Sequence, residues 1–129
     1  MLAALLATGC AATPEQQAVQ RNAAARNLAE AIDGRVAGEA QTCIALGTTQ
    51  GPQIVAPDTL IYRENQRRIW VTRSPGCPGL SGDPVIVARV FGSQLCRNDL
   101  FQTVPRGGAA VPGPLCRFGT FTPYVRAGS

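Results

Sequence analysis

Cysteine is the most versatile reactive side chain in this sequence, and its spacing limits the chemistry that the chain can support. The chain has five cysteines and no histidine or lysine. Cys10 stands apart near the start, and the others are Cys43, Cys77, Cys96 and Cys116. No two of them are spaced as Cys-x-x-Cys, whereas structural zinc sites usually combine such a pair with further cysteines or histidines. We therefore expect no metal site.

The four later cysteines instead predict two disulfides. An even number of cysteines in a small chain that is exported is typical of a cross-linked domain. Three pairings are possible. We favour Cys77 with Cys96 and Cys43 with Cys116, because the second bond would tie the first strand of the domain to the last.

The usual catalytic side chains are missing. Without histidine and lysine, the chain has neither the common general bases nor the amines that form Schiff bases. The carboxylates of the later part, Asp58, Glu64, Asp83 and Asp99, are not close to one another in the sequence. We predict no catalytic residue and no cofactor. A histidine-free hydrolase that depends on an acidic residue is the alternative.

One short segment resembles an enzyme motif. Residues 77–84, CPGLSGDP, resemble the nucleophile segment of trypsin-like serine proteases. The resemblance implies that Ser81 attacks and that the amides of Gly79 and Ser81 form the oxyanion hole. A serine hydroxyl without a base is a poor nucleophile, and neither histidine nor lysine is present to act as one. We therefore interpret Gly79, Gly82 and Pro84 as turn residues before a strand.

Cys10 follows a short apolar stretch, MLAALLATG, which ends in small residues. This pattern resembles the lipobox of bacterial lipoproteins, in which a peptidase cuts before a cysteine that carries a diacylglycerol. The resemblance implies lipidation of Cys10 and, because Ala11 rather than aspartate follows, sorting to the outer membrane. A signal needs a charged start and roughly 7 to 15 apolar residues, so we expect the natural start to lie upstream. The alternative is an ordinary free thiol in the first turn of a buried helix.

The elements that position these residues begin with a helix. Residues 13–16, TPEQ, form a capping-box pattern with proline in the first helical position, which predicts a helix from Pro14 to about Gly34. Its larger apolar residues form a thin stripe of Val19, Leu28 and Ile32. A thin stripe can pack on one side at most. We interpret the helix as a spacer between a lipid anchor and a domain, with loose docking as the alternative.

From Gln41 onward, short apolar stretches alternate with turn signals, which is typical of an all-β domain. We expect a first strand in TCIAL, a hairpin from TLIYR and RRIWVTR with Trp70 in the core, and later strands at residues 100–104 and 117–123. The apolar run at residues 84–91 predicts a central strand buried on both faces. The predicted fold class is mainly β: an N-terminal helix followed by a small antiparallel β barrel or sandwich with two disulfides.

The chain thus divides into a signal remnant (residues 1–9), an anchor and helical spacer (10–40), a cross-linked β domain (41–124) and a tail (125–129). All twelve basic residues are arginine, and most of them lie in the β part of a chain with net charge +4. Such a balance favours anionic partners, although scattered arginines also occur on any solvated surface.

Several segments together resemble a protein family. They are CIAL at Cys43, DTLIYR at Asp58, RRIWVTR, GCPGL, GSQLCRNDL and CRFGTFTPY at Cys116. The series resembles an uncharacterised family of small exported proteins, often lipoproteins, from proteobacteria that include sphingomonads, and it covers most of residues 36–124. The resemblance implies a compact β domain with four cysteines. Asp58 and Asp99 are candidate binding residues, with the capping of a local turn as the alternative.

These observations predict a non-enzymatic envelope lipoprotein, in the outer membrane and facing the periplasm, that acts as a binding or structural module. Its expected partners are the membrane, through a lipid anchor on Cys10, and an envelope protein or an anionic envelope component. We expect no nucleic-acid partner. A protease inhibitor that presents the loop of residues 74–84 and the hydrolase named above are the alternatives.

Overall fold

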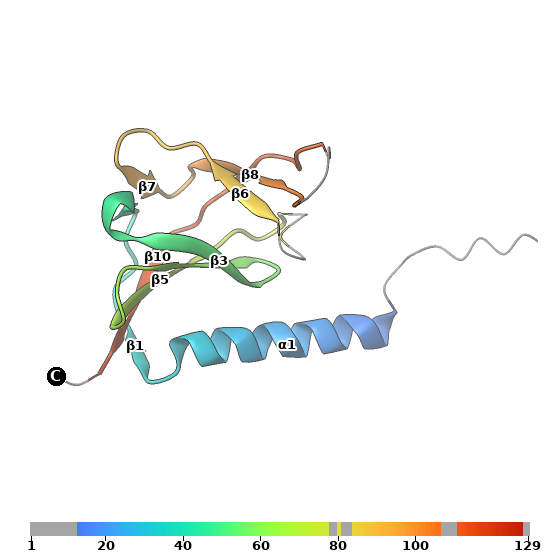
Figure 1. The fold of residues 1–129 in the computed structure, drawn as a ribbon. Helices are drawn as coiled ribbons and strands as arrows, with labels where there is room; N and C mark the ends of the chain where they lie inside the picture. The colour runs from blue at the N-terminus through green and yellow to red at the C-terminus, as the bar shows by residue number, and fades with distance from the viewer. Residues whose placement is uncertain (1–12, 78–79, 81–83, 107–110, 128–129) are drawn as a thin grey trace, which may run out of the picture.

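The described residues of the computed structural model are 13–77, 80, 84–106 and 111–127. They form three layers: a helix, a five-stranded antiparallel sheet, and two small antiparallel sheets on the opposite face of the large one (Figure 1). The fold is therefore mainly β with one N-terminal helix, as the sequence predicts. The sheets do not close into a barrel.

Helix α1 (Pro14–Ile32) begins at the predicted residue. The main-chain N–H of Gln16 donates to Thr13 Oγ1 at 3.2 Å, and the main-chain N–H of Thr13 donates to Gln16 Oε1 at 3.0 Å. These bonds form the predicted capping box and satisfy donors that a first helical turn leaves unpaired. After Ile32, Gly34 turns the chain with φ of +68°, a conformation that glycine adopts without strain.

The C-terminal end of α1 lies on the five-stranded sheet. Its side chains Leu28, Ala31 and Ile32 pack against a buried cluster made of Val55, Ile61, Ile69 and Val71. Nearer the start of the helix, Val19 is 65% exposed. The thin apolar stripe therefore docks only near its end. This part of the helix is therefore docked on the sheet, which was the alternative to a free spacer.

The five-stranded sheet is built around the predicted hairpin. Its order is β1 (Arg35–Ala37), β10 (Phe121–Arg126), β5 (Arg68–Arg73), β4 (Thr59–Arg63) and β3 (Gln50–Ala56). Strands β4 and β5 form the hairpin. Strand β1 lies in the segment assigned to the spacer, and β10 extends into the segment assigned to the tail. The sheet therefore extends beyond residues 41–124 at both ends.

The side chains of β4 alternate between two cores. Leu60 and Tyr62 belong to a cluster shared with the small sheets, whereas Ile61 belongs to the cluster under α1. Both faces of the large sheet are thus covered, as expected for its inner strands.

Trp70 takes a smaller part in the core than predicted. It is half-buried and packs against the edge of the larger cluster, with the Arg68 guanidinium 5.8 Å from its ring centroid. The centre of that cluster is filled instead by Phe101, Phe118 and Phe121, which are almost fully buried. Of these, Phe101 and Phe118 have ring centroids 4.4 Å apart.

The two small sheets contain the remaining strands. One pairs β2 (Cys43–Ala45) with β7 (Gln94–Cys96), and a short 3-10 helix, η1 (Leu46–Thr48), follows β2. The other has the order β6 (Val85–Ala88), β8 (Leu100–Val104) and β9 (Cys116–Arg117). Strand β8 has the predicted bounds. The single strand expected at residues 117–123 is instead divided between β9 and β10, which belong to different sheets.

The apolar run at residues 84–91 is not a central strand, contrary to the prediction. Strand β6 is an edge strand that pairs with β8 alone. Ile86 and Ala88 pack against the core, but Val87 is 50% exposed and Phe91 is 84% exposed. The prediction was wrong because a continuous apolar run does not reveal how many strands pair with it or how many layers cover it.

The disulfides join Cys43 to Cys96 and Cys77 to Cys116, so the favoured pairing was wrong. Cys43 and Cys96 lie directly opposite each other in the β2–β7 pair, with Cα atoms 4.0 Å apart. The first and last strands are joined by the hydrogen bonds of β1 with β10, without a disulfide. Proximity in the fold therefore determines the pairing, through a strand pair in the case of Cys43 and Cys96, whereas the prediction relied on order in the sequence.

Candidate functional site

Asp99, a candidate binding residue, caps the turn between β7 and β8. Its Oδ2 accepts the main-chain N–H of Cys96 at 2.7 Å, and its own N–H donates to the Cys96 carbonyl at 3.0 Å. Asn98 in the same turn has φ of +71°, a left-handed conformation that asparagine tolerates better than most residues. The Asp99 carboxylate therefore has a local structural role.

Asp58, the other candidate, lies in the turn between β3 and β4. Its Oδ1 accepts the hydroxyl of Thr59 at 2.8 Å, and its main-chain carbonyl accepts the N–H of Ser74 at 2.8 Å. The bond to Ser74 ties this turn to the end of β5. Each carboxylate thus accepts a hydrogen bond within its own turn. This is the local turn-capping role that was named as the alternative to binding.

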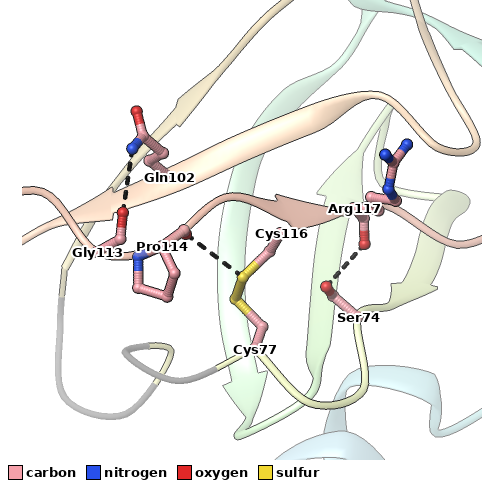
Figure 2. The surroundings of a disulfide bond; sticks show 7 residues. All are labelled: Ser74, Cys77, Gln102, Gly113, Pro114, Cys116 and Arg117. Atoms are coloured by element: carbon pink, nitrogen blue, oxygen red, sulfur yellow. Dashed lines mark hydrogen bonds between the residues drawn. A yellow bond between two sulfur atoms is a disulfide. The ribbon is translucent and has the colours of Figure 1, made fainter.

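The segment considered as an inhibitory loop, residues 74–84, is fixed to the domain at its described positions. Figure 2 shows the Ser74 hydroxyl donating to the Arg117 carbonyl at 2.7 Å and Cys77 bonded to Cys116. Ser74, Cys77 and Leu80 are buried. Ser81, Gly79 and Gly82 lie outside the described residues, as does the lipidation candidate Cys10.

A cluster of arginines lies at one end of the five-stranded sheet. It was not predicted from the sequence. The cluster lines a pocket of about 620 Å³ between the ends of β1, β3, β4 and β10 and the turn that joins β4 to β5. We name it the arginine pocket, and its lining residues are Arg35, Gln50, Arg63, Glu64, Asn65, Gln66 and Arg126.

Arg35 is held in place by main-chain carbonyl groups. Its Nε donates to the carbonyl of Ala31 near the end of α1 at 3.2 Å. Its two terminal nitrogens donate to the carbonyls of Arg67, at 2.5 Å, and Gln66, at 3.1 Å. A guanidinium has five N–H groups, so two remain beyond these three bonds. The side chain therefore braces the helix end against the β4–β5 turn and still has donors to offer.

Arg126 and Arg63 complete the cationic part of the pocket. Arg126 lies opposite Arg35 in the β1–β10 pair, and its Nε donates to the Gln66 carbonyl at 3.2 Å. Arg63 donates to the Gln53 side-chain oxygen at 2.9 Å. Both side chains are exposed. Among the described residues, their other terminal N–H groups have no hydrogen-bond partner.

The arginines of the pocket repel one another. Burial, together with the positive charges of Arg126 and Arg63, holds the pKa of the Arg35 guanidinium below its ordinary value. Glu64, the acidic residue of the lining, pairs with Arg68 at 3.2 Å outside the cluster. Within the described residues, Arg35, Arg63 and Arg126 form no ion pair. Such a group can bind an anion through charge-assisted hydrogen bonds.

The lining residues of the arginine pocket lie far apart in the sequence, and this explains why no motif revealed it. Arg35 and Arg126 lie near opposite ends of the described chain and meet through the pairing of β1 with β10. The available signal was coarser: an excess of arginine in the β part without matching acidic residues. Locating the site required the strand register, which the composition does not contain.

A second pair of arginines provides a comparison within the same molecule. Arg73 and Arg97 line a separate pocket of about 480 Å³, whose lining includes Leu28, Val71 and Tyr124. This pocket has apolar walls on the α1 side and two guanidiniums, whereas the arginine pocket has three guanidiniums among amide side chains.

Comparison of the chain with protein-family models, curated proteins and solved structures found no match. In the part of the chain that the structure describes, no helix has both the length and the apolar character needed to cross a membrane. Nor do three or more acidic, cysteine or histidine side chains gather there in a way that could hold a metal ion.

Proposed function

We propose that this chain is an exported envelope lipoprotein, anchored through Cys10, that binds an anionic component of the envelope and does not act as an enzyme. The observation that carries the proposal is the pairing of all four cysteines of the β domain in two disulfides. Disulfides persist in oxidising compartments such as the periplasm and are rare in the cytosol. The lipobox-like segment before Cys10 and the resemblance to small exported lipoproteins support the same compartment.

The architecture suits an anchored binding module. Cys10 lies close in sequence to Pro14, where α1 begins, and the 19 residues of α1 span about 28 Å at 1.5 Å per residue. A lipid group on Cys10 would hold one end of this helix at the membrane, while the other end lies on the sheet beside the arginine pocket. Two or more acyl chains make such attachment stable, whereas one chain gives only marginal binding.

The proposed binding role is based on the distribution of charged side chains. Asp58 and Asp99 are engaged in their own turns. The arginine pocket instead presents guanidinium N–H groups without acidic partners among the described residues. This distribution favours a negatively charged partner over a cationic one.

The test is the intact mass of the protein purified from its native membrane, measured before and after reduction and alkylation. We expect a polypeptide that begins at Cys10, carries acyl mass, and gains alkyl groups on four cysteines only after reduction. An unacylated chain that retains Met1 and has free thiols would contradict the proposal.

The matched control is Cys10→Ser, which removes the anchor and leaves the four later cysteines unchanged. We expect this variant to lack acyl mass, to remain uncut before residue 10 and to keep both disulfides. A Cys10→Ser variant that still carries acyl mass would show that Cys10 is not the point of attachment.

A further inference from the structure

We propose that the arginine pocket binds the phosphate group of a phosphate monoester, through the guanidinium groups of Arg63 and Arg126, with Arg35 beside them in the lining. The inference deepens the proposed function, because it gives the anionic component a chemical class and a location. The phosphate could belong to a soluble sugar phosphate or to a lipid headgroup. Both sources present the same tetrahedral, doubly charged group.

The first argument is the number of positive charges. Three guanidiniums line the pocket, and the lining carboxylate, Glu64, is paired with Arg68. A carboxylate ligand carries one negative charge, whereas a phosphate monoester carries about −1.5 to −2 at pH 7. A doubly charged ligand therefore offsets the mutual repulsion of the arginines more completely. Guanidinium groups also match phosphate geometry, because two parallel N–H groups can reach two phosphate oxygens.

The second argument is that part of the site is already ordered. Arg35 makes three hydrogen bonds to main-chain carbonyls of α1 and the β4–β5 turn. The Gln66 carbonyl accepts bonds from both Arg35 and Arg126 and so links the two side chains. Binding then orders less side-chain freedom than it would for arginines on an open surface. Arg35 acts here mainly as a positioning residue.

The third argument concerns the rest of the ligand. The lining also includes the amide side chains of Gln50, Asn65 and Gln66. The Asn65 oxygen already accepts the main-chain N–H groups of Arg67 and Arg68, both at 2.8 Å, which leaves its amide N–H groups as donors. Amides can bond hydroxyl groups in either direction. A pocket of about 620 Å³ is large enough for a phosphate with an attached sugar or glycerol.

The experiment titrates the oxidised 129-residue chain, by isothermal calorimetry, with inorganic phosphate and with glucose 6-phosphate. We expect saturable binding that weakens as sodium chloride is added. The double variant Arg63→Gln/Arg126→Gln should bind roughly tenfold or more weakly, because it removes the two exposed guanidiniums of the site.

The matched control is Arg73→Gln/Arg97→Gln, which removes the same charge from the other pocket. We expect its affinity to stay within about twofold of the wild type, since its arginines lie outside the site. Thermal unfolding of both variants reports whether either substitution disturbs the fold. Arg35→Gln should lower the unfolding midpoint as well as the affinity, because Arg35 braces the helix end.

A second arm of the experiment identifies the source of the phosphate. Sedimentation with phosphatidylcholine vesicles that contain phosphatidic acid is compared with sedimentation with phosphatidylcholine vesicles alone. Binding to the phosphatidic acid vesicles that Arg63→Gln/Arg126→Gln abolishes supports a lipid headgroup, and binding of glucose 6-phosphate alone supports a soluble ligand. Absence of binding in both arms overturns the inference, as does an equal loss in both double variants. Neither result changes the mass of the anchored protein, so the two proposals can fail separately.

Discussion

Removing the two disulfides one at a time should reveal both the pairing and the contribution of each bond to stability. The structure joins Cys43 to Cys96 and Cys77 to Cys116. The double variant Cys43→Ala/Cys96→Ala therefore removes one complete bond and leaves the other intact. With Cys10 changed to serine in every protein, no thiol should remain in this variant.

The expected magnitudes follow from loop length and burial. The bonded cysteines are 53 and 39 residues apart in sequence. On the chain-entropy relation, loops of these lengths contribute about 4.2 and about 3.9 kcal/mol at 25 °C. Cys77 and Cys116 are each 8% exposed, so alanine there also removes packed sulfur atoms, at about 1 kcal/mol per residue. The buried pair should therefore cost about 6 kcal/mol and the other pair about 4.

Urea unfolding followed by tryptophan fluorescence measures these free energies, and thiol titration under native conditions counts the free cysteines. Losses of this size approach the whole stability of a small domain, so the Cys77→Ala/Cys116→Ala protein should be largely unfolded without stabilising salts. Two free thiols in Cys43→Ala/Cys96→Ala would refute the pairing, since each remaining cysteine would then have lost its partner. A larger cost for the Cys43 and Cys96 pair would refute the argument from burial.

Three local features of the fold can be tested by substitution and urea unfolding. At Gly119, a Cβ would lie 2.6 Å from a main-chain oxygen of β5, so Gly119→Ala should cost about 1 to 3 kcal/mol of stability. The control is Gly47→Ala, where a Cβ would have nothing within 4 Å, and it should change stability by less than about 0.5 kcal/mol. The buried Thr72 hydroxyl has no partner among the described residues, so Thr72→Val should stabilise the protein by about 1 kcal/mol, and a loss would show that the hydroxyl is bonded. Burial raises the pKa of Tyr62, so the unfolded chain releases this proton first and stability should fall as pH rises above about 10. Tyr62→Phe should remove that part of the pH dependence, and an unchanged slope would contradict it.

The sequence predicted those elements whose signals are local. The capping box at Thr13 and Gln16 is local to one helical turn and was identified correctly. The β4–β5 hairpin was also predicted, because its two strands adjoin in sequence and alternate in the same way. Such elements can be predicted without knowledge of the remaining chain, since the sequence signals lie within the segments themselves.

The errors share a different cause, which is dependence on contacts between distant segments. Whether the run at residues 84–91 is central or at an edge depends on which strands pair with it, and β6 has β8 as its one neighbour. The disulfide pairing depends on the antiparallel register of β2 with β7, which places Cys43 opposite Cys96. Neither pairing leaves a signal in the composition of the strands themselves. The arginine pocket was missed for the same reason, since it forms where β1 meets β10.

The position of the arginine pocket relative to the proposed anchor favours a soluble ligand over a lipid headgroup of the same membrane. Helix α1 begins near Cys10 in sequence and ends beside Arg35, and about 28 Å separates its two ends. In Figure 1 the start of α1 and the strand ends that form the pocket lie at opposite sides of the molecule. With α1 upright on a lipid-anchored Cys10, the pocket opens well beyond the Debye length of about 8 Å from the membrane surface. Headgroup binding would require α1 to lie flat on the membrane. For the anchored protein, competition between glucose 6-phosphate and phosphatidic acid in the same membrane would contradict the upright arrangement.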